Sequence, residues 1–178
     1  MTILFLCSGN IHRSAHAEAL LRERARRDGR TDLTIRSAGV VAVDGMAAVG
    51  EAVQVAGEAG IDLGSHRSSP ATAATLADAE QILVMESFHI EWLALNHPDC
   101  APRARLLTEY GSATMRSLGV EPGQDLPDAI GGDRESFRRS FAILQECVLR
   151  LYEALPPAPQ EVYAAAIESR FRALRRAP

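Results

Sequence analysis

Residues 2–14 decide the fold, and they read TILFLCSGNIHRS. The apolar block 2–6 ends at Cys7 and is bounded by a Gly-Asn turn, which is typical of a short buried strand. Residues 14–23 are rich in Ala, Leu, Glu and Arg, which predicts a helix. A tight loop between a strand end and a helix start turns its backbone N–H groups inward, with the positive end of the helix dipole behind them. The stretch therefore predicts a concave anion site.

A cysteine and an arginine separated by five residues indicate phosphate chemistry at this site. Arg13 can close it with a two-pronged hydrogen bond onto two phosphate oxygens. The field that attracts phosphate also favours the thiolate of Cys7, which can attack phosphorus in line and form a phosphocysteine. Ser14 can donate its hydroxyl to the sulfur and make it a better leaving group in the second step. The residues expected to bind the phosphate are Ser8, Gly9, Asn10, Ile11, His12, Arg13 and Ser14.

Taken singly, these residues have simpler interpretations. Cys7 alone would be a small buried hydrophobe, and Arg13 alone a solvated residue at a helix start. The whole constellation between a strand and a helix favours the catalytic interpretation.

Residues 7–14 strongly resemble the N-terminal loop of the low-molecular-weight protein tyrosine phosphatases. That family also contains bacterial protein-arginine phosphatases and thioredoxin-coupled arsenate reductases, and its pattern is Cys-x-Gly-Asn-x-Cys-Arg-Ser-Pro. This chain has His12 where a second cysteine is common, which removes the partner for a protective disulfide with the nucleophile. It has Ala15 where proline is usual, which costs some rigidity at the helix start.

Length and composition favour one soluble α/β domain. The chain has 178 residues, 47% of them hydrophobic and 24% charged, which is enough for one full core and too little for two. A formal net charge of -4 disfavours nucleic acid or an anionic membrane as the main partner. No segment approaches the ~20 apolar residues of a membrane helix, and the N-terminus lacks the layout of a signal peptide. Cys7, Cys100 and Cys147 form no close pair, so neither a disulfide framework nor a zinc site is expected. We expect a cytoplasmic enzyme without metal or cofactor.

Short apolar strands alternate with helices along the chain. Further strands are expected at 33–36, 82–85 and 105–107, and helices at 14–27, 47–59, 69–78, 88–95, 134–154 and 161–176. This alternation predicts a parallel sheet covered on both faces, with the first strand inside it and ligand at the carboxyl ends of the strands. The resemblance implies a single-domain, three-layer, doubly wound α/β fold with a four-stranded parallel sheet over residues 1–155. Residues 156–178 are expected to form a proline-rich break and a C-terminal helical extension.

A phosphatase of this kind needs a proton donor for the leaving group, and an aspartate on a mobile loop would serve. Residues 123–133 read GQDLPDAIGGD and resemble the family's Asp-x-Pro-Asp-Pro-aromatic-Gly-Gly loop. The resemblance implies that Asp128 is the acid and later the base that activates water. Ala129 stands where the family has the loop's second proline, so the loop is expected to be looser. Ile130 stands where the family has an aromatic residue, which would stack on a phosphotyrosine ring. Asp125 is expected to hold the loop and Asp133 to cap the following helix.

The resemblance also implies a supporting network beneath the phosphate loop, formed by Asn10, Ser14, Ser37 and His66. An asparagine tolerates the left-handed backbone that such a loop needs, and a buried imidazole can bridge its amide to a serine. His12 and His16 are expected to be bystanders, with His12 the better candidate to touch ligand. Packing roles are expected for Met85, Glu86 and Trp92.

Phosphotyrosine is the first expectation for the substrate, carried by a phosphoprotein or peptide, and the enzyme is expected to be a monomer or weak homodimer. Among family members a threonine two residues before the arginine goes with phosphoarginine, whereas Ile11 is bulky and apolar. Protein-arginine phosphatase is the alternative, because Ile130 weakens the aromatic wall. Arsenate reductase would need two further cysteines near residues 80–90, where there are none. A non-catalytic phosphate-binding module is favoured only by Ala129.

Overall fold

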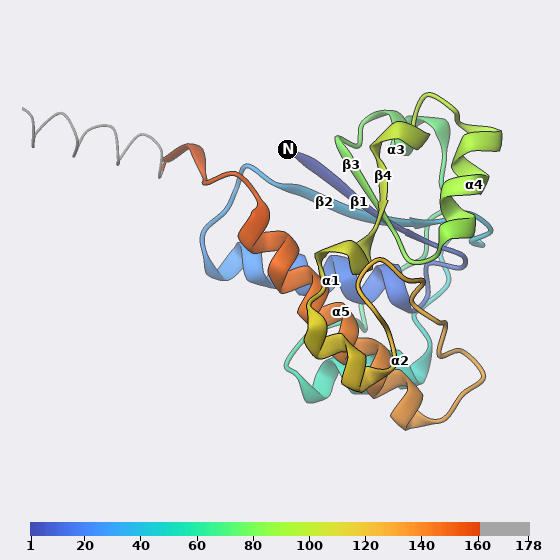
Figure 1. Ribbon diagram of the computed structural model, residues 1–178, viewed down its shortest axis with the longest axis vertical. Helices are drawn as coiled ribbons and strands as arrows, with labels where there is room; N and C mark the ends of the chain where they lie inside the picture. The colour runs from blue at the N-terminus through green and yellow to red at the C-terminus, as the bar shows by residue number, and fades with distance from the viewer. Residues whose placement is uncertain (161–178) are drawn as a thin grey trace, which may run out of the picture.

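The structure is a computed structural model that describes residues 1–160, and the helix expected at 161–176 lies outside the described residues. Its centre is a four-stranded parallel sheet in the order β2-β1-β3-β4 (Figure 1). The strands are β1 (Thr2–Cys7), β2 (Thr34–Gly39), β3 (Gln81–Val84) and β4 (Ala104–Leu106). The expected three-layer α/β fold is confirmed, with β1 inside the sheet.

Helices cover both faces of the sheet (Figure 1). On one side lie α1 (Arg13–Arg27), α2 (Gly50–Glu58) and α5 (Arg134–Ala154), and on the other α3 (Ala73–Ala77) and α4 (Ser87–Asn96). Short 3-10 helices span Ala101–Arg103, Leu107–Tyr110 and Ala113–Leu118. The strand β1 supplies both cores because successive side chains point to opposite faces. Its Ile3 and Phe5 pack with α1 and α5, and its Leu4 and Leu6 pack on the side of α3 and α4.

The third helix starts later than the sequence predicted. Ser69 and Pro70 were expected to open it, but α3 begins at Ala73 and is capped by Thr72, whose hydroxyl accepts from the amide of Thr75. The reason is that residues 69–71 pair with the end of β2: the Gly39 N–H donates to the Ser69 carbonyl and the Ala71 N–H donates to the Gly39 carbonyl, both at 2.9 Å. The Ser69 carbonyl is therefore used by β2 instead of by a first helical turn, and the Ser69 N–H donates to the Asn10 side chain at 2.8 Å.

Gly39 lets β2 approach the phosphate loop closely. A Cβ at this position would lie 2.5 Å from the carbonyl oxygen of Ser8 and 2.9 Å from the amide nitrogen of Asn10. Both atoms belong to backbone, so a side chain could not be accommodated without moving the loop. The loop is thereby held between β2 and the start of α1.

Candidate active site

The phosphate loop begins where β1 ends, at Cys7. Its thiol is 3% exposed, and its sulfur lies 3.0 Å from the hydroxyl of Ser14 in the first turn of α1. The backbone N–H of Asn10 also donates to this sulfur, at 3.3 Å. The sulfur thus has the Asn10 N–H as a donor and the Ser14 hydroxyl within hydrogen-bond distance, a position suited to a nucleophile.

Asn10 organises the loop from within. Its φ of 54° places it in the left-handed region, as its residue type allows. Its side-chain amide donates to Ser14 at 2.9 Å and to Ser37 at 2.8 Å. The ring of His66 donates to the backbone carbonyl of Asn10 at 2.7 Å. The structure thus brings together the four expected supporting residues, but the imidazole does not bridge the amide to a serine, because that amide reaches both serines itself.

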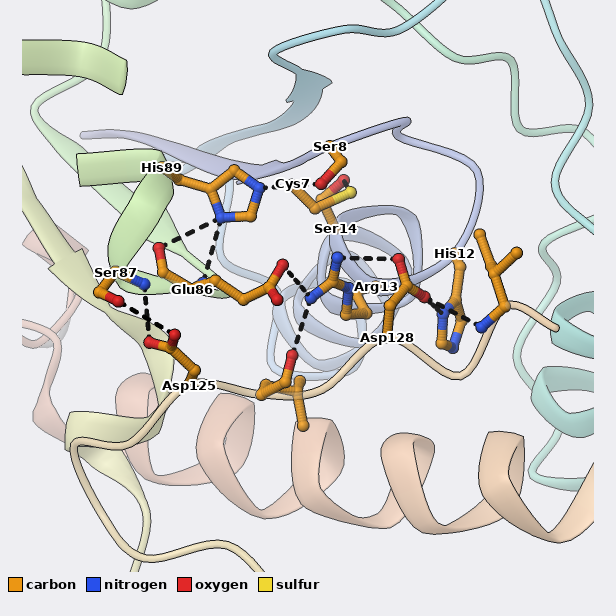
Figure 2. Close-up of polar contacts among 12 residues, drawn as sticks. Cys7, Ser8, His12, Arg13, Ser14, Glu86, Ser87, His89, Asp125 and Asp128 are labelled. Atoms are coloured by element: carbon orange, nitrogen blue, oxygen red, sulfur yellow. Dashed lines mark hydrogen bonds and ion pairs between the residues drawn. The ribbon is translucent and has the colours of Figure 1, made fainter. Parts of the chain in front are cut away.

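Arg13 is fully buried, at 1% exposure, and its two edges have different partners (Figure 2). Its Nη1 donates to Glu86 Oε2 at 2.6 Å and to the carbonyl of Leu126 at 2.7 Å. Its Nη2 donates to Asp128 Oδ2 at 2.8 Å, whereas its buried Nε has no hydrogen-bond partner among residues 1–160. Because Nε and Nη2 lie on the same edge of a guanidinium, they form a fork that fits two phosphate oxygens. Nη1 anchors the side chain, and Asp128 occupies part of the fork.

Asp128 sits between Arg13 and His12 (Figure 2). Its Oδ1 accepts from His12 Nδ1 at 3.0 Å and from the amide of Ile130 at 3.2 Å. Burial alone would raise the pKa of this carboxyl, but the hydrogen bond from His12, the charge of Arg13 and the Ile130 amide outweigh burial and lower the pKa to about 2. Asp128 is therefore ionised at neutral pH while it holds the arginine.

Two residues of this site were missed by the sequence interpretation. Glu86 was assigned to packing, which is wrong: it holds Arg13. His89 Nε2 lies 3.3 Å from the Ser8 hydroxyl, and burial together with the charge of Arg13 lowers the pKa of this ring to about 4, so the ring is neutral. A signal was available, because Glu86 lies two residues after the end of β3 and the carboxyl ends of parallel strands meet at one edge of the sheet.

The other two aspartates of the loop at 123–133 have structural partners. Asp125 accepts from the amide and the hydroxyl of Ser87, at 2.7 and 3.0 Å, and so ties the loop to the start of α4 (Figure 2). Asp133 caps α5 by accepting from the amide of Ser136 at 2.9 Å. Of the three candidates, Asp128 is the one that contacts the phosphate loop.

No group of three or more His, Cys, Asp or Glu side chains within residues 1–160 is placed to hold a metal ion. In the same range, no helix combines the length and the apolar character needed to cross a membrane.

A buried thiol and an arginine fork on one loop between a parallel strand and a helix, with a carboxylate on that fork, define the class of cysteine-dependent phosphatases. The chain belongs to the low molecular weight phosphotyrosine protein phosphatase family, whose sequence profile matches residues 2–160. Both the fold and the resemblance predicted from the sequence are thereby confirmed.

Relatives in this family carry two different activities in their names. The chain is 31% identical over 155 residues to a protein-arginine-phosphatase of Bacillus subtilis, covering 87% of this chain and 97% of the relative. It is 37% identical over 147 residues to the probable low molecular weight protein-tyrosine-phosphatase EpsP of Ralstonia solanacearum, and the match covers 83% of this chain and 90% of EpsP. Among solved structures, the tyrosine phosphatase Wzb from Escherichia coli K30 with sulphate matches with a TM-score of 0.75 at 28% identity, covering 87% of this chain and 98% of Wzb.

Proposed function

We propose that this phosphatase hydrolyses phosphotyrosine in proteins through a phosphocysteine on Cys7. The observation that carries the proposal is the half-open fork of Arg13, whose Nε is buried without a partner among residues 1–160 and whose Nη2 is held by a displaceable carboxylate. A bound phosphate would take both positions. A solved variant of the arginine phosphatase YwlE with a phosphorylated active-site serine shows that a relative with this fold can hold a phosphoryl group on its protein.

In the first step the Cys7 thiolate forms a bond to phosphorus while the bond from phosphorus to the phenolic oxygen breaks. Asp128 gives its proton to the departing oxygen, and Arg13 holds the charge on the phosphoryl oxygens. In the second step Asp128 takes a proton from water, the water oxygen attacks phosphorus, and the thiolate leaves.

Displacement of Asp128 from Arg13 prepares it to act as an acid. The hydrogen bond from His12 and the charge of Arg13 keep the pKa of Asp128 at about 2 against the effect of burial. A phosphate dianion on the fork neutralises Arg13 and places negative charge beside the carboxyl, and both changes raise the pKa of Asp128. The proton is then bound where the leaving group needs it.

Tyrosine is favoured over arginine by the apolar side chains near the site. Ile11 lies within the phosphate loop, and Ile130, two residues beyond the acid, is 47% exposed. Phe88, in the first turn of α4 beside His89, is 43% exposed. An aryl ring gains from contact with such side chains, whereas a charged guanidinium loses hydration against them. Protein-arginine phosphatase is the second candidate, because relatives of both kinds are similar to this chain.

Phosphate release from one phosphotyrosine peptide and one phosphoarginine peptide of the same sequence tests the proposal, with Cys7→Ser as the control. We expect the wild type to release phosphate from the phosphotyrosine peptide and Cys7→Ser to release none. We expect Ile11→Thr to release more phosphate from the phosphoarginine peptide than the wild type does. Release from phosphoarginine alone would overturn the substrate assignment while keeping the chemistry. No release from either peptide would overturn the proposed activity.

We further propose that residues 1–155 form the catalytic domain, that 156–178 extend it, and that the enzyme is a cytoplasmic monomer or weak homodimer. Cys7, Cys100 and Cys147 are all free thiols in the structure, which supports a reducing compartment. Sedimentation of the full chain at several concentrations, and the activity of a chain ending at residue 155, test these points.

A further inference from the structure

His12 links the phosphate loop to the residue proposed as the acid. Its side chain is 1% exposed, and its ring packs against Phe137 and His16 with centroid distances of 4.7 and 5.3 Å. These contacts fix the ring plane. Its Nδ1 lies 3.0 Å from Asp128 Oδ1, across 116 residues of sequence.

The hydrogen bonds of Asp128 make its two oxygens unequal. Oδ1 accepts from His12 and from the Ile130 amide, so its acceptor positions are in use. Oδ2 faces Arg13, the side on which a phosphate would bind. Once a phosphate takes Arg13 Nη2, no donor points at Oδ2 while two still point at Oδ1, so a proton taken up by the carboxyl belongs on Oδ2.

We propose that His12 is a positioning residue for Asp128: its Nδ1–H holds Oδ1 and so directs Oδ2 toward the leaving group. The inference rests on the proposed function of Asp128. The tautomer with hydrogen on Nδ1 leaves a lone pair on Nε2, which is buried and has no partner among residues 1–160. His12 thus makes its one polar side-chain contact with Asp128.

Two departures from the family pattern meet at this carboxylate. The loop carries Ala129 where a proline would restrain Asp128, and the phosphate loop carries His12 where a cysteine is common. The hydrogen bond from His12 restrains the Asp128 side chain, whereas the loop backbone, with Ala129 in place of proline, restrains it less. This pairing explains why a fully buried, polar ring is placed there.

A double-mutant cycle tests whether His12 acts through Asp128. The variants are His12→Leu, His12→Asn and Asp128→Asn, and kcat/KM is measured on phenyl phosphate and p-nitrophenyl phosphate. We expect His12→Leu to lose about tenfold on phenyl phosphate, the effect of one hydrogen bond, and less on the nitrophenyl ester, which leaves without help. His12→Asn, which keeps an N–H near the Nδ1 position, should retain most activity. In the Asp128→Asn background, His12→Leu should cost nothing further.

His16→Leu is the matched control, since His16 is an equally buried neighbour that does not contact Asp128. We expect it to lower stability without any dependence on the leaving group. If His12→Leu lowered kcat/KM equally on phenyl phosphate and p-nitrophenyl phosphate, and did so again in the Asp128→Asn background, His12 would have a packing role only. That result would overturn the inference.

A titration of the Asp128 carboxyl by NMR tests the contact without activity, so it separates a failure of this inference from a failure of the proposed function. The charged and titratable groups around Asp128 are Arg13 and His12 in contact, with Glu86 and His89 beyond them. His12→Leu should raise the pKa of Asp128 from about 2, and His12→Asn should raise it less. An unchanged pKa in His12→Leu would overturn the inference even if the enzyme is active.

Discussion

Asp128→Asn should slow the phosphatase while making it bind inorganic phosphate more tightly. Asp128 Oδ2 accepts from Arg13 Nη2 at 2.8 Å, so an incoming phosphate must displace this carboxylate. An exposed ion pair contributes up to about 1 kcal/mol, and breaking a buried one costs about 3–5 kcal/mol. The Asp128 side chain is 33% exposed, which places this pair toward the weaker end, at about 1.4 kcal/mol, or tenfold in affinity.

Isothermal titration of inorganic phosphate at pH 7 measures this effect. We expect the Kd of Asp128→Asn to be about tenfold lower than that of the wild type, and its kcat on an aryl phosphate to fall by about 10²–10⁴. Asp125→Asn removes the same charge from the same loop without a contact to Arg13, so it should leave the Kd within about twofold. Weaker or unchanged binding in Asp128→Asn would refute competition between this carboxylate and phosphate for the fork.

Three further results are expected. Ser14→Ala removes a donor to the Cys7 sulfur and should slow alkylation of that thiol by iodoacetate at pH 6 by about tenfold; an unchanged rate would contradict this role. Gly39→Ala forces a Cβ against the Ser8 carbonyl and should lower the free energy of unfolding by about 1–3 kcal/mol and reduce kcat, as urea unfolding and kinetics would show. Burial lowers the pKa of His16 from 6.5 to about 4, so the unfolded chain binds a proton that the folded chain does not. His16 alone should therefore lower stability by about 3 kcal/mol as pH drops from 6.5 to 4, and His16→Asn should remove that part of the slope in urea titrations.

The features that were predictable from the sequence are local ones. The strand, loop and helix around Cys7 follow from neighbouring residues, and so does the amphipathic helix α5 with its cap at Asp133. The predicted start of α3 was wrong because a tertiary contact decides it: the Ser69 carbonyl and the Ala71 N–H are already bonded to Gly39 at the end of β2.

The partners of Arg13 depend on distances that no local pattern encodes. Glu86 and Asp128 lie 73 and 115 residues further along the chain. The position of Asp128 could be inferred because its surroundings resemble a known loop, whereas Glu86 lacks such a motif and was taken for a packing residue. The contact between His12 and Asp128 depends on a departure from the pattern at His12, so the pattern could not predict it.

The direct test of the chemistry is to find the phosphoryl group on the protein. The wild type and Asp128→Asn would be mixed with p-nitrophenyl phosphate, whose leaving group needs no acid, quenched in acid within the first turnovers, and digested for mass spectrometry. We expect phosphate on the peptide that contains Cys7, at higher occupancy in Asp128→Asn because the water-activating base is missing. Turnover without phosphate on Cys7, or phosphate on another residue, would contradict the proposed role of this cysteine.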